Sequence, residues 1–225
     1  MNNRKKAAFF RAEGTVLKRG VLAASAYLAG NAQKFGERAL RLGFVAMAAP
    51  LHGLLGQNDR TLATRVANLA FRGMTEDRIA ELSEEYARDI LQHNILDQGV
   101  ELMKRARREG HRIVLLSDNI RSIMEPLLPH LRLVDELVCN ELEFRDREAT
   151  GKLQEPVIGG HGWKPWLERY ADEHDLDLSQ SVAYGTHGPD LLLLSTIGRP
   201  CAVNPDYTLR RAAREADWPV IEYRD

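Results

Sequence analysis

The chain has 225 residues, of which 44% are hydrophobic and 28% charged, and its formal net charge is −1. This length suits one core domain with an inserted subdomain, and the composition excludes a disordered chain. A net charge near zero gives no bulk electrostatic basis for binding nucleic acid. The apolar run behind the basic N-terminus is too short for a signal peptide. Cys139 and Cys201 follow no metal-binding or redox spacing, so we expect reduced thiols in a cytoplasmic protein.

The charge is distributed unevenly along the chain. Residues 1–75 contain 12 Lys and Arg against 3 Asp and Glu (+9), whereas residues 76–225 contain 19 against 29 (−10). The basic part is also apolar over residues 21–55. We favour helices that pack on one another there, because apolar periodicity is first of all a core signal. The alternative is a basic amphipathic surface that contacts an anionic membrane or an acyl lipid, which would place the protein peripherally on the inner membrane surface.

The predicted elements begin with a short apolar strand at residues 7–10. Residues 16–98 are then predicted to be mostly helical. A helix is expected to begin at Thr75, because Ile79 and Leu82 follow at helical spacing. A further helix is predicted over 97–108, and Gly110 ends it.

After Gly110 the pattern changes to strands that alternate with helices. Strands are predicted at 112–116, in parts of 133–144, and at 181–184, 200–203 and 220–223. Helices are predicted from after Ser117 to about residue 128, and at 162–174, 190–197 and 207–216, with a turn at 150–152. This alternation indicates an α/β fold with a doubly wound parallel sheet. The helical segment 16–98 is too long for a crossover, so it predicts an inserted cap on a core domain made of 1–15 and 99–225.

Three polar loops follow predicted strands, at residues 11–15, 117–119 and 186–190. The carboxyl ends of parallel strands meet at one edge of a sheet, and ligands bind there. We therefore expect these loops to form one site.

The motifs in these loops resemble those of the haloacid dehalogenase superfamily, in its phosphoserine-phosphatase-like branch with a helical cap after the first motif. The stretch Arg11-Ala12-Glu13-Gly14-Thr15 stands where the family has D-x-D-G-T. The resemblance therefore places Arg11 at the position of the nucleophilic aspartate and Glu13 at that of the acid/base aspartate. Ser117, at the end of an apolar strand, matches the phosphate-binding residue of the second motif.

The remaining motifs also match in part. Lys164 is the best candidate for the lysine of the third motif, and Lys152 is the less favoured one. In the fourth motif the chain keeps the glycine and Asp190, but Thr186 replaces the first aspartate. Trp163 and Trp166 flank Lys164 and are more consistent with packing than with a ligand platform.

The resemblance implies an aspartyl-phosphate intermediate and a Mg²⁺ ion held by the nucleophile, a backbone carbonyl and an acidic residue of the fourth motif. Arg11 removes the nucleophile and one metal ligand, and Thr186 stands at another lost ligand position, so Asp190 is a metal ligand only if Mg²⁺ binds. We therefore expect no cofactor and a pseudophosphatase that binds a phosphorylated ligand, a protein or a lipid surface. The alternative is a Mg²⁺-dependent phosphomonoester hydrolase with an altered site.

Two interpretations of Arg11 remain open. In the favoured one, its guanidinium replaces the metal and pairs with Glu13 and Asp190 in a closed ion network. In the other, Arg11, Ser117 and Lys164 bind a phosphate or another anion without cleaving it. A metal centre of His187, Glu13 and Asp190 is a minor alternative, because no paired ligand spacing supports it.

Overall fold

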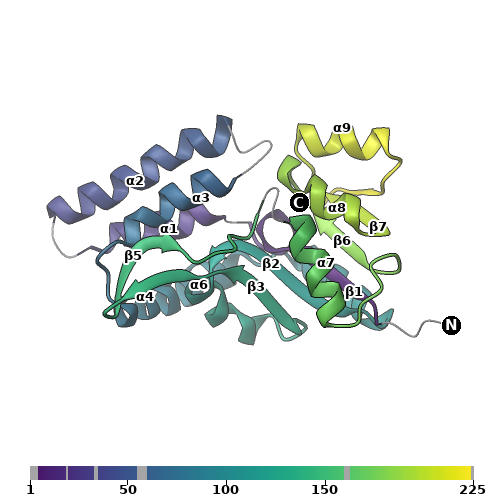
Figure 1. Cartoon of the computed structure of the whole chain (residues 1–225), viewed down its shortest axis with the longest axis horizontal. Coiled ribbons are helices and arrows are strands. Elements are labelled where there is room, and N and C mark those ends of the chain that lie inside the picture. Colours follow the sequence, from purple (N-terminus) through teal and green to yellow (C-terminus); the bar gives the residue numbers. More distant parts are fainter. Residues whose placement is uncertain (1–4, 19, 33–34, 55–59, 160–162, 224–225) are drawn as a thin grey trace.

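The computed structural model describes residues 5–18, 20–32, 35–54, 60–159 and 163–223. A six-stranded parallel sheet of order β3-β2-β1-β6-β7-β8 forms the core, and β4 and β5 form a separate antiparallel hairpin (Figure 1). The strands are β1 (Ala7–Arg11), β2 (Arg112–Ile120), β3 (Glu136–Asn140), β4 (Leu142–Arg145), β5 (Glu148–Leu153), β6 (Val182–Gly185), β7 (Arg199–Val203) and β8 (Val220–Ile221). The predicted doubly wound parallel sheet is thus confirmed.

Helices cover both faces of this sheet and also form the segment between β1 and β2. They are α1 (Val21–Gly30), α2 (Phe35–Leu54), α3 (Thr61–Asn68), α4 (Glu76–Asp89), α5 (Asp97–Arg108), α6 (Arg121–Met124), α7 (Trp163–Glu173), α8 (Leu191–Thr196) and α9 (Tyr207–Glu215). Among the described residues, no helix is both long and apolar enough to cross a membrane.

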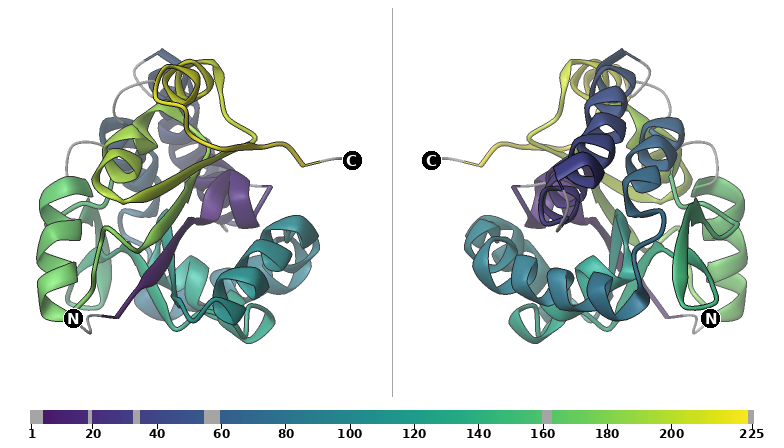
Figure 2. Two further views of the ribbon diagram at one scale, coloured as in Figure 1. Left: turned by 90° about the vertical axis from the view of Figure 1, so that its right-hand side faces the viewer. Right: turned by 90° about the vertical axis from the view of Figure 1, so that its left-hand side faces the viewer.

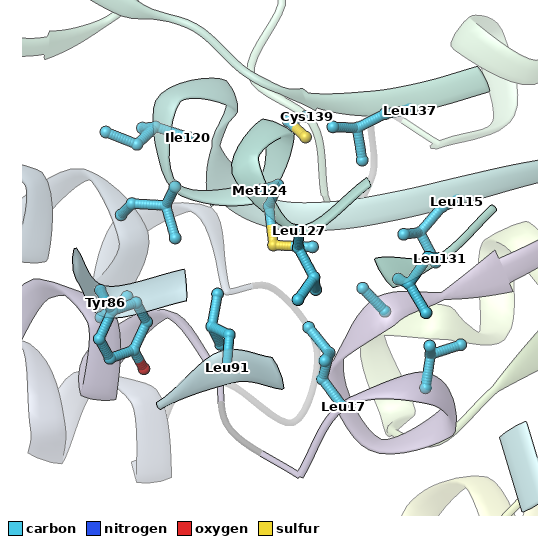
Figure 3. Packing of buried hydrophobic residues seen from close by; sticks show 14 of the residues in the cluster. Leu17, Tyr86, Leu91, Leu115, Ile120, Met124, Leu127, Leu131, Leu137 and Cys139 are labelled. Atoms are coloured by element: carbon cyan, nitrogen blue, oxygen red, sulfur yellow. The ribbon is translucent and has the colours of Figure 1, made fainter. Parts of the chain in front are cut away.

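Alternation along β1 divides the core between the two faces of the sheet. Ala8 and Phe10 point into a cluster with residues of α5, α6 and the cap, whereas Ala7 and Phe9 point into one with α7, α8 and α9. All five residues of β1 are buried, as expected for a central strand of a parallel sheet. Figure 3 shows part of the first cluster, which includes Leu17 from the segment after β1, Leu91 from the insertion and Leu115 from β2.

The helical insertion between β1 and β2 contains α1 to α4. Its outermost helix, α2, rests on α1 and α3 at the edge of the molecule (Figures 1 and 2). The predicted helix start at Thr75 is confirmed, because the Thr75 hydroxyl accepts the backbone N–H of Arg78 at the N-terminus of α4. The exact boundaries of the cap, 16 and 98, stay a prediction.

The turn predicted at residues 150–152 is wrong. These residues lie in β5, and the chain reverses instead at Asp146 and Arg147, which both have positive φ as in a two-residue hairpin. Gly151 serves a different purpose, because a Cβ atom there would lie 3.1 Å from Cβ of Arg72 in the cap. The glycine lets the hairpin approach the cap closely.

Candidate functional site

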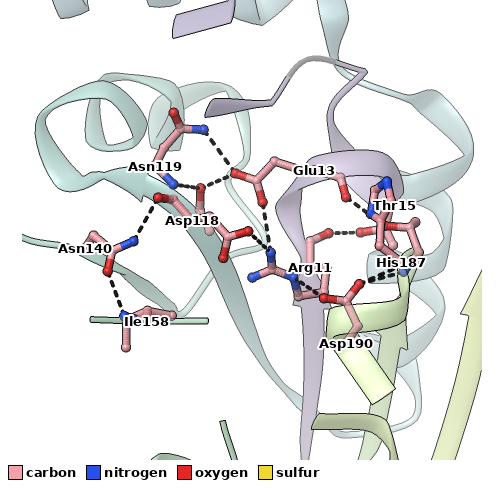
Figure 4. A network of polar contacts seen from close by, with 11 residues as sticks. Arg11, Glu13, Thr15, Asp118, Asn119, Asn140, Ile158, His187 and Asp190 are labelled. Carbon is pink, nitrogen blue, oxygen red and sulfur yellow. Dashed lines mark hydrogen bonds and ion pairs between the residues drawn. The ribbon is translucent and has the colours of Figure 1, made fainter. Parts of the chain in front are cut away.

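Polar side chains from three strand ends meet beside β1, the strand at which the sheet order reverses. Arg11 is the last residue of β1, residues 117–119 lie in the last part of β2, and residues 186–190 follow β6. The strands β2 and β6 flank β1 on its two sides. Ligands of open α/β sheets bind at such a reversal. Figure 4 shows that side chains of the three segments meet there, as the sequence predicted, although residues 117–119 belong to the end of β2 and not to a loop.

The side chain of Arg11 lies at the centre of this meeting point and pairs with three carboxylates. Its Nη2 atom is 2.6 Å from Asp118 Oδ2 and 3.6 Å from Glu13 Oε2, and its Nε atom is 2.9 Å from Asp190 Oδ1. All four residues are buried, with no more than 7% of any of them exposed. They are called the ion network below.

The ion network keeps Arg11 charged. Burial alone would lower the pKa of Arg11, but the adjacent carboxylates, Asp118 above all, raise that pKa above its ordinary value. The buried indole of Trp163 covers the guanidinium, with Arg11 Cζ 5.1 Å from the ring centroid. Trp163 is thus a packing residue, and the group it packs against is a cation.

Glu13 is bound by side chains of β2 as well as by Arg11. Ser117 Oγ donates a hydrogen bond to Glu13 Oε1, and Asn119 Nδ2 donates to the same oxygen over 3.0 Å. Burial raises the pKa of Glu13, while Arg11 opposes that rise and Asp118 adds to it. Ser117 is therefore engaged inside the protein, where the resemblance had placed it as a phosphate-binding residue.

The loop after β6 is fixed by Asp190 and Thr186. Asp190 Oδ2 accepts the backbone N–H groups of Thr186 and His187, over 2.9 and 3.0 Å. Thr186 Oγ1 donates to the backbone carbonyl of Glu13 over 3.0 Å, so His187 Nδ1, 2.7 Å away, must itself donate to that hydroxyl oxygen. A Cβ atom on Gly14 would lie 2.8 Å from Thr186 Oγ1, which explains the glycine.

The family model for haloacid dehalogenase-like hydrolases matches residues 8–195. This chain belongs to that family. Phosphoserine phosphatase SerB1 of Mycobacterium tuberculosis is 28% identical over 186 residues, which cover 81% of this chain and 60% of the relative. The inhibition of morphological differentiation protein of Streptomyces azureus is 29% identical over 153 residues, which cover 68% of this chain and 54% of the relative. The match therefore spans little more than half the length of either relative.

Solved structures give the same fold for the haloacid dehalogenase-like chain. A Bordetella pertussis Tohama I protein of unknown function superimposes with a TM-score of 0.82 at 21% identity, over 97% of this chain and 99% of the other. A phosphoserine phosphatase in its apo form superimposes with a TM-score of 0.71 at 16% identity, over 99% and 96%. The chain lies in the phosphoserine-phosphatase-like branch of the superfamily.

The donor groups present do not fit the Mg²⁺ ion that phosphatases of this family use. Arg11 places a guanidinium where the first carboxylate ligand would be. The backbone carbonyl of Glu13 accepts the Thr186 hydroxyl. Both oxygens of Asp190 are occupied, one by Arg11 Nε and the other by two backbone N–H groups. Mg²⁺ needs several oxygen ligands in near-octahedral geometry and is repelled by an adjacent cation.

Lys164 does not join the ion network, although the sequence made it the candidate for the third motif. Its side chain is 60% exposed and its Nζ atom lies 4.0 Å from Glu168. The reason is the phase of α7. Trp163 and Leu167 face the sheet, and Lys164, which is about 100° further round the helix than Trp163, faces solvent. Lys152, the less favoured candidate, is exposed on β5.

Asp118 is the network residue that the sequence reasoning missed. It follows Ser117 directly and contributes the shortest contact to Arg11. Asn140 Nδ2 donates to its backbone carbonyl over 2.8 Å and so fixes its position. The sequence signal that could have identified Asp118 is a carboxylate directly after the serine of the second motif. His161, also near a predicted site loop, lies outside the described residues.

Proposed function

We propose that this protein is a pseudophosphatase, which keeps the phosphatase fold but does not hydrolyse phosphomonoesters and acts through binding. The observation that supports this best is the guanidinium of Arg11 between Asp118 and Asp190, at the position of the family's nucleophile. A guanidinium is protonated at any ordinary pH and cannot attack phosphorus. The favoured interpretation of Arg11 as one member of an ion network agrees with these contacts.

The same contacts argue against a phosphorylated ligand in this site. Three carboxylates surround one guanidinium, so an incoming phosphate would face more negative than positive charge. Ser117 already donates to Glu13, and Lys164 points to solvent. A protein or lipid surface is therefore the better candidate partner. The S. azureus relative is named for an inhibition and not for a reaction, which accords with a role that needs no turnover.

The test is the rate of phosphate release from a broad panel of phosphomonoesters, with and without Mg²⁺. We expect no turnover by the native chain, and a rate above about 1 s⁻¹, which is ordinary for an enzyme, would overturn the proposal. The matched variant is the triple change Arg11→Asp, Glu13→Asp, Thr186→Asp. Activity in that variant alone would mean that the chain kept the site geometry and lost only its chemistry.

One feature favours a second candidate, weak hydrolysis by an altered site. A carboxyl group with a raised pKa, as Glu13 has, suits general acid or base catalysis near neutral pH. If the native chain does release phosphate, the Glu13→Gln variant should lose that activity. Unchanged phosphate release by Glu13→Gln would assign the activity to a contaminant.

A further inference from the structure

The hairpin of β4 and β5 belongs to the core by its place in the sequence, but its backbone pairs with the cap. The N–H of Gly73 donates to the carbonyl of Ala149, and the N–H of Ala149 donates to the carbonyl of Met74, each over 2.8 Å. The N–H of Glu76 donates to the carbonyl of Arg147 over 2.9 Å. The segment that follows α3 thus runs antiparallel to β5 and is joined to the hairpin by three backbone hydrogen bonds.

The face of β5 that meets the cap is apolar and closely packed. Ala149, Gly151 and Leu153 alternate along β5 and are all buried, so they lie on one side of the strand. Ala149 and Leu153 belong to one apolar cluster with residues of α1 and α4. A Cβ atom on Gly151 would lie 3.2 Å from Cα of Leu69 in the cap. Separating the hairpin from the cap would therefore expose apolar surface as well as break backbone hydrogen bonds.

The helix that leads into this contact also lies over the ion network. A Cβ atom on Gly159 would lie 3.7 Å from Asp118 Oδ1 and 3.2 Å from Cγ2 of Thr61, the first residue of α3. From there α3 and the short 3₁₀ helix Leu69–Phe71 run without a break to the segment that the hairpin holds. α3 also contacts β5, beside which it lies in Figure 1. One continuous helical segment therefore connects the covered site with the hairpin.

We propose that the hairpin is a latch, which holds the cap closed over the ion network. A segment joined to a core by two linkers can move as a lid. In the linkers of the cap, Lys18 N–H donates to the carbonyl of Asn94, and Leu96 N–H donates to that of Val16. The two linkers therefore lie side by side, and a lid would turn about them. The hairpin holds the cap at a second place and so opposes that movement. This inference does not depend on whether the ion network hydrolyses anything.

The test is the rate at which an aromatic disulfide reagent labels single thiols placed in the closed contact. Ala149→Cys puts a thiol on the hairpin, and Thr64→Cys puts one in the first turn of α3. The native residues are 2% and 3% exposed. We expect both thiols to react at least about a hundredfold more slowly than that of Met47→Cys, a position 59% exposed, because labelling requires the contact to open. The native chain, whose two cysteines are buried, gives the background.

The latch is weakened by Glu76→Pro, which deletes the N–H that donates to Arg147. Glu76 is exposed and is the first residue of α4, a position where proline leaves a helix intact. We expect this substitution to raise the labelling rates of Ala149→Cys and Thr64→Cys by about threefold to tenfold, the effect of losing one hydrogen bond. Tyr207→Pro is the matched control, because Tyr207 is exposed and is the first residue of α9, and it should change neither rate.

Three results would overturn the proposal. In the first, the thiol of Ala149→Cys reacts as fast as that of Met47→Cys, so that the hairpin is not closed on the cap. In the second, Glu76→Pro and Tyr207→Pro have equal effects on labelling. In the third, Glu76→Pro speeds labelling in the hairpin alone, so that the hairpin contacts the cap without controlling the position of α3.

A disulfide variant tests the latch without proline. Thr75 and Glu148 face each other as an antiparallel pair, a geometry in which two cysteines can be bridged. In the chain with Thr64→Cys, a disulfide closed between Thr75→Cys and Glu148→Cys should slow labelling of the α3 thiol at least about threefold relative to Thr64→Cys alone. An unchanged rate would contradict the latch, whether or not the chain with Glu76→Pro folds.

Discussion

At the scale of single residues, Arg11 determines the character of the site. Its one positive charge is shared by three buried carboxylates, so it has a structural role in the site. Removing one partner of a buried ion pair is costly, because the remaining charges stay buried without compensation.

We therefore expect Arg11→Met to lower the free energy of unfolding by about 3–5 kcal/mol, the usual loss for breaking a buried ion pair. Urea denaturation at neutral pH measures this. Arg145→Met is the matched control, since the Arg145 side chain is 73% exposed and pairs only at the surface, and it should change stability by less than about 0.5 kcal/mol. Equal effects of the two substitutions would mean that the ion network contributes no stability.

Glu13 should make stability depend on pH. Its pKa in the folded state is raised above the ordinary 4.5, so the folded protein holds a proton that the unfolded chain has already released. The contribution of Glu13 to stability should therefore be fully present below about pH 4.5 and be lost as pH rises through its raised pKa. Glu13→Gln should flatten this part of the curve of unfolding free energy against pH. Glu84→Gln, at an exposed position of α4, should leave it unchanged, and an identical curve for Glu13→Gln would contradict the assignment.

The residues of the site were predictable only in part. Arg11, Glu13 and Asp190 lie at strand ends, where topology alone brings them together, and their pairing was expected. The roles of Asp118 and Lys164 were not predicted correctly, because each role depends on the direction in which the side chain points, and the sequence does not give that direction. A residue at the end of a strand can face either side of the crevice, and a residue on a helix turns by about 100° with each step.

At the scale of elements, periodicity identified most strands and helices, but the helix predicted after Ser117 begins only at Arg121, because β2 continues to Ile120. Close approaches between elements gave no signal in the sequence. Gly151 was taken for a turn residue, whereas it permits contact between β5 and the cap. Gly99 in α5 is a similar case, because a Cβ atom there would overlap the backbone carbonyl of Thr15. Contact distances of this kind arise from tertiary packing and leave no periodic signal.

We expect Gly99→Ala to lower the free energy of unfolding by about 1–3 kcal/mol, as overpacking does. Gly43→Ala is the matched substitution in another helix, where no atom lies within 4 Å of the added Cβ. Alanine there should raise stability by about 0.5–1 kcal/mol, because it restricts the unfolded chain and favours helix. Opposite signs in urea denaturation would confirm the packing of α5 on the loop after β1, and a neutral Gly99→Ala would contradict it.

At the scale of the whole molecule, the fold does not dictate the chemistry. The sheet, the cap and the meeting of three strand ends are those of a phosphatase, and the topology that creates the crevice is independent of the residues placed in it. The proposed loss of the metal site has one consequence that can be measured on the whole protein. Its stability should not respond to Mg²⁺, because only a ligand that binds the folded state shifts unfolding.

The midpoint of urea unfolding of the native chain should therefore be the same in about 10 mM Mg²⁺ as in NaCl of equal ionic strength, which controls for screening. The variant Arg11→Asp, Glu13→Asp, Thr186→Asp restores carboxylates at the two lost ligand positions and frees Asp190 from the guanidinium. If its site binds Mg²⁺ with a Kd one hundredth of the concentration used, it should gain about 2.7 kcal/mol. Stabilisation of the native chain beyond the salt control would place a metal site in it and overturn the proposed loss of metal-dependent chemistry. If Mg²⁺ does not raise the unfolding midpoint of the triple variant, the surrounding donors, Asp118 among them, are not arranged to bind the metal.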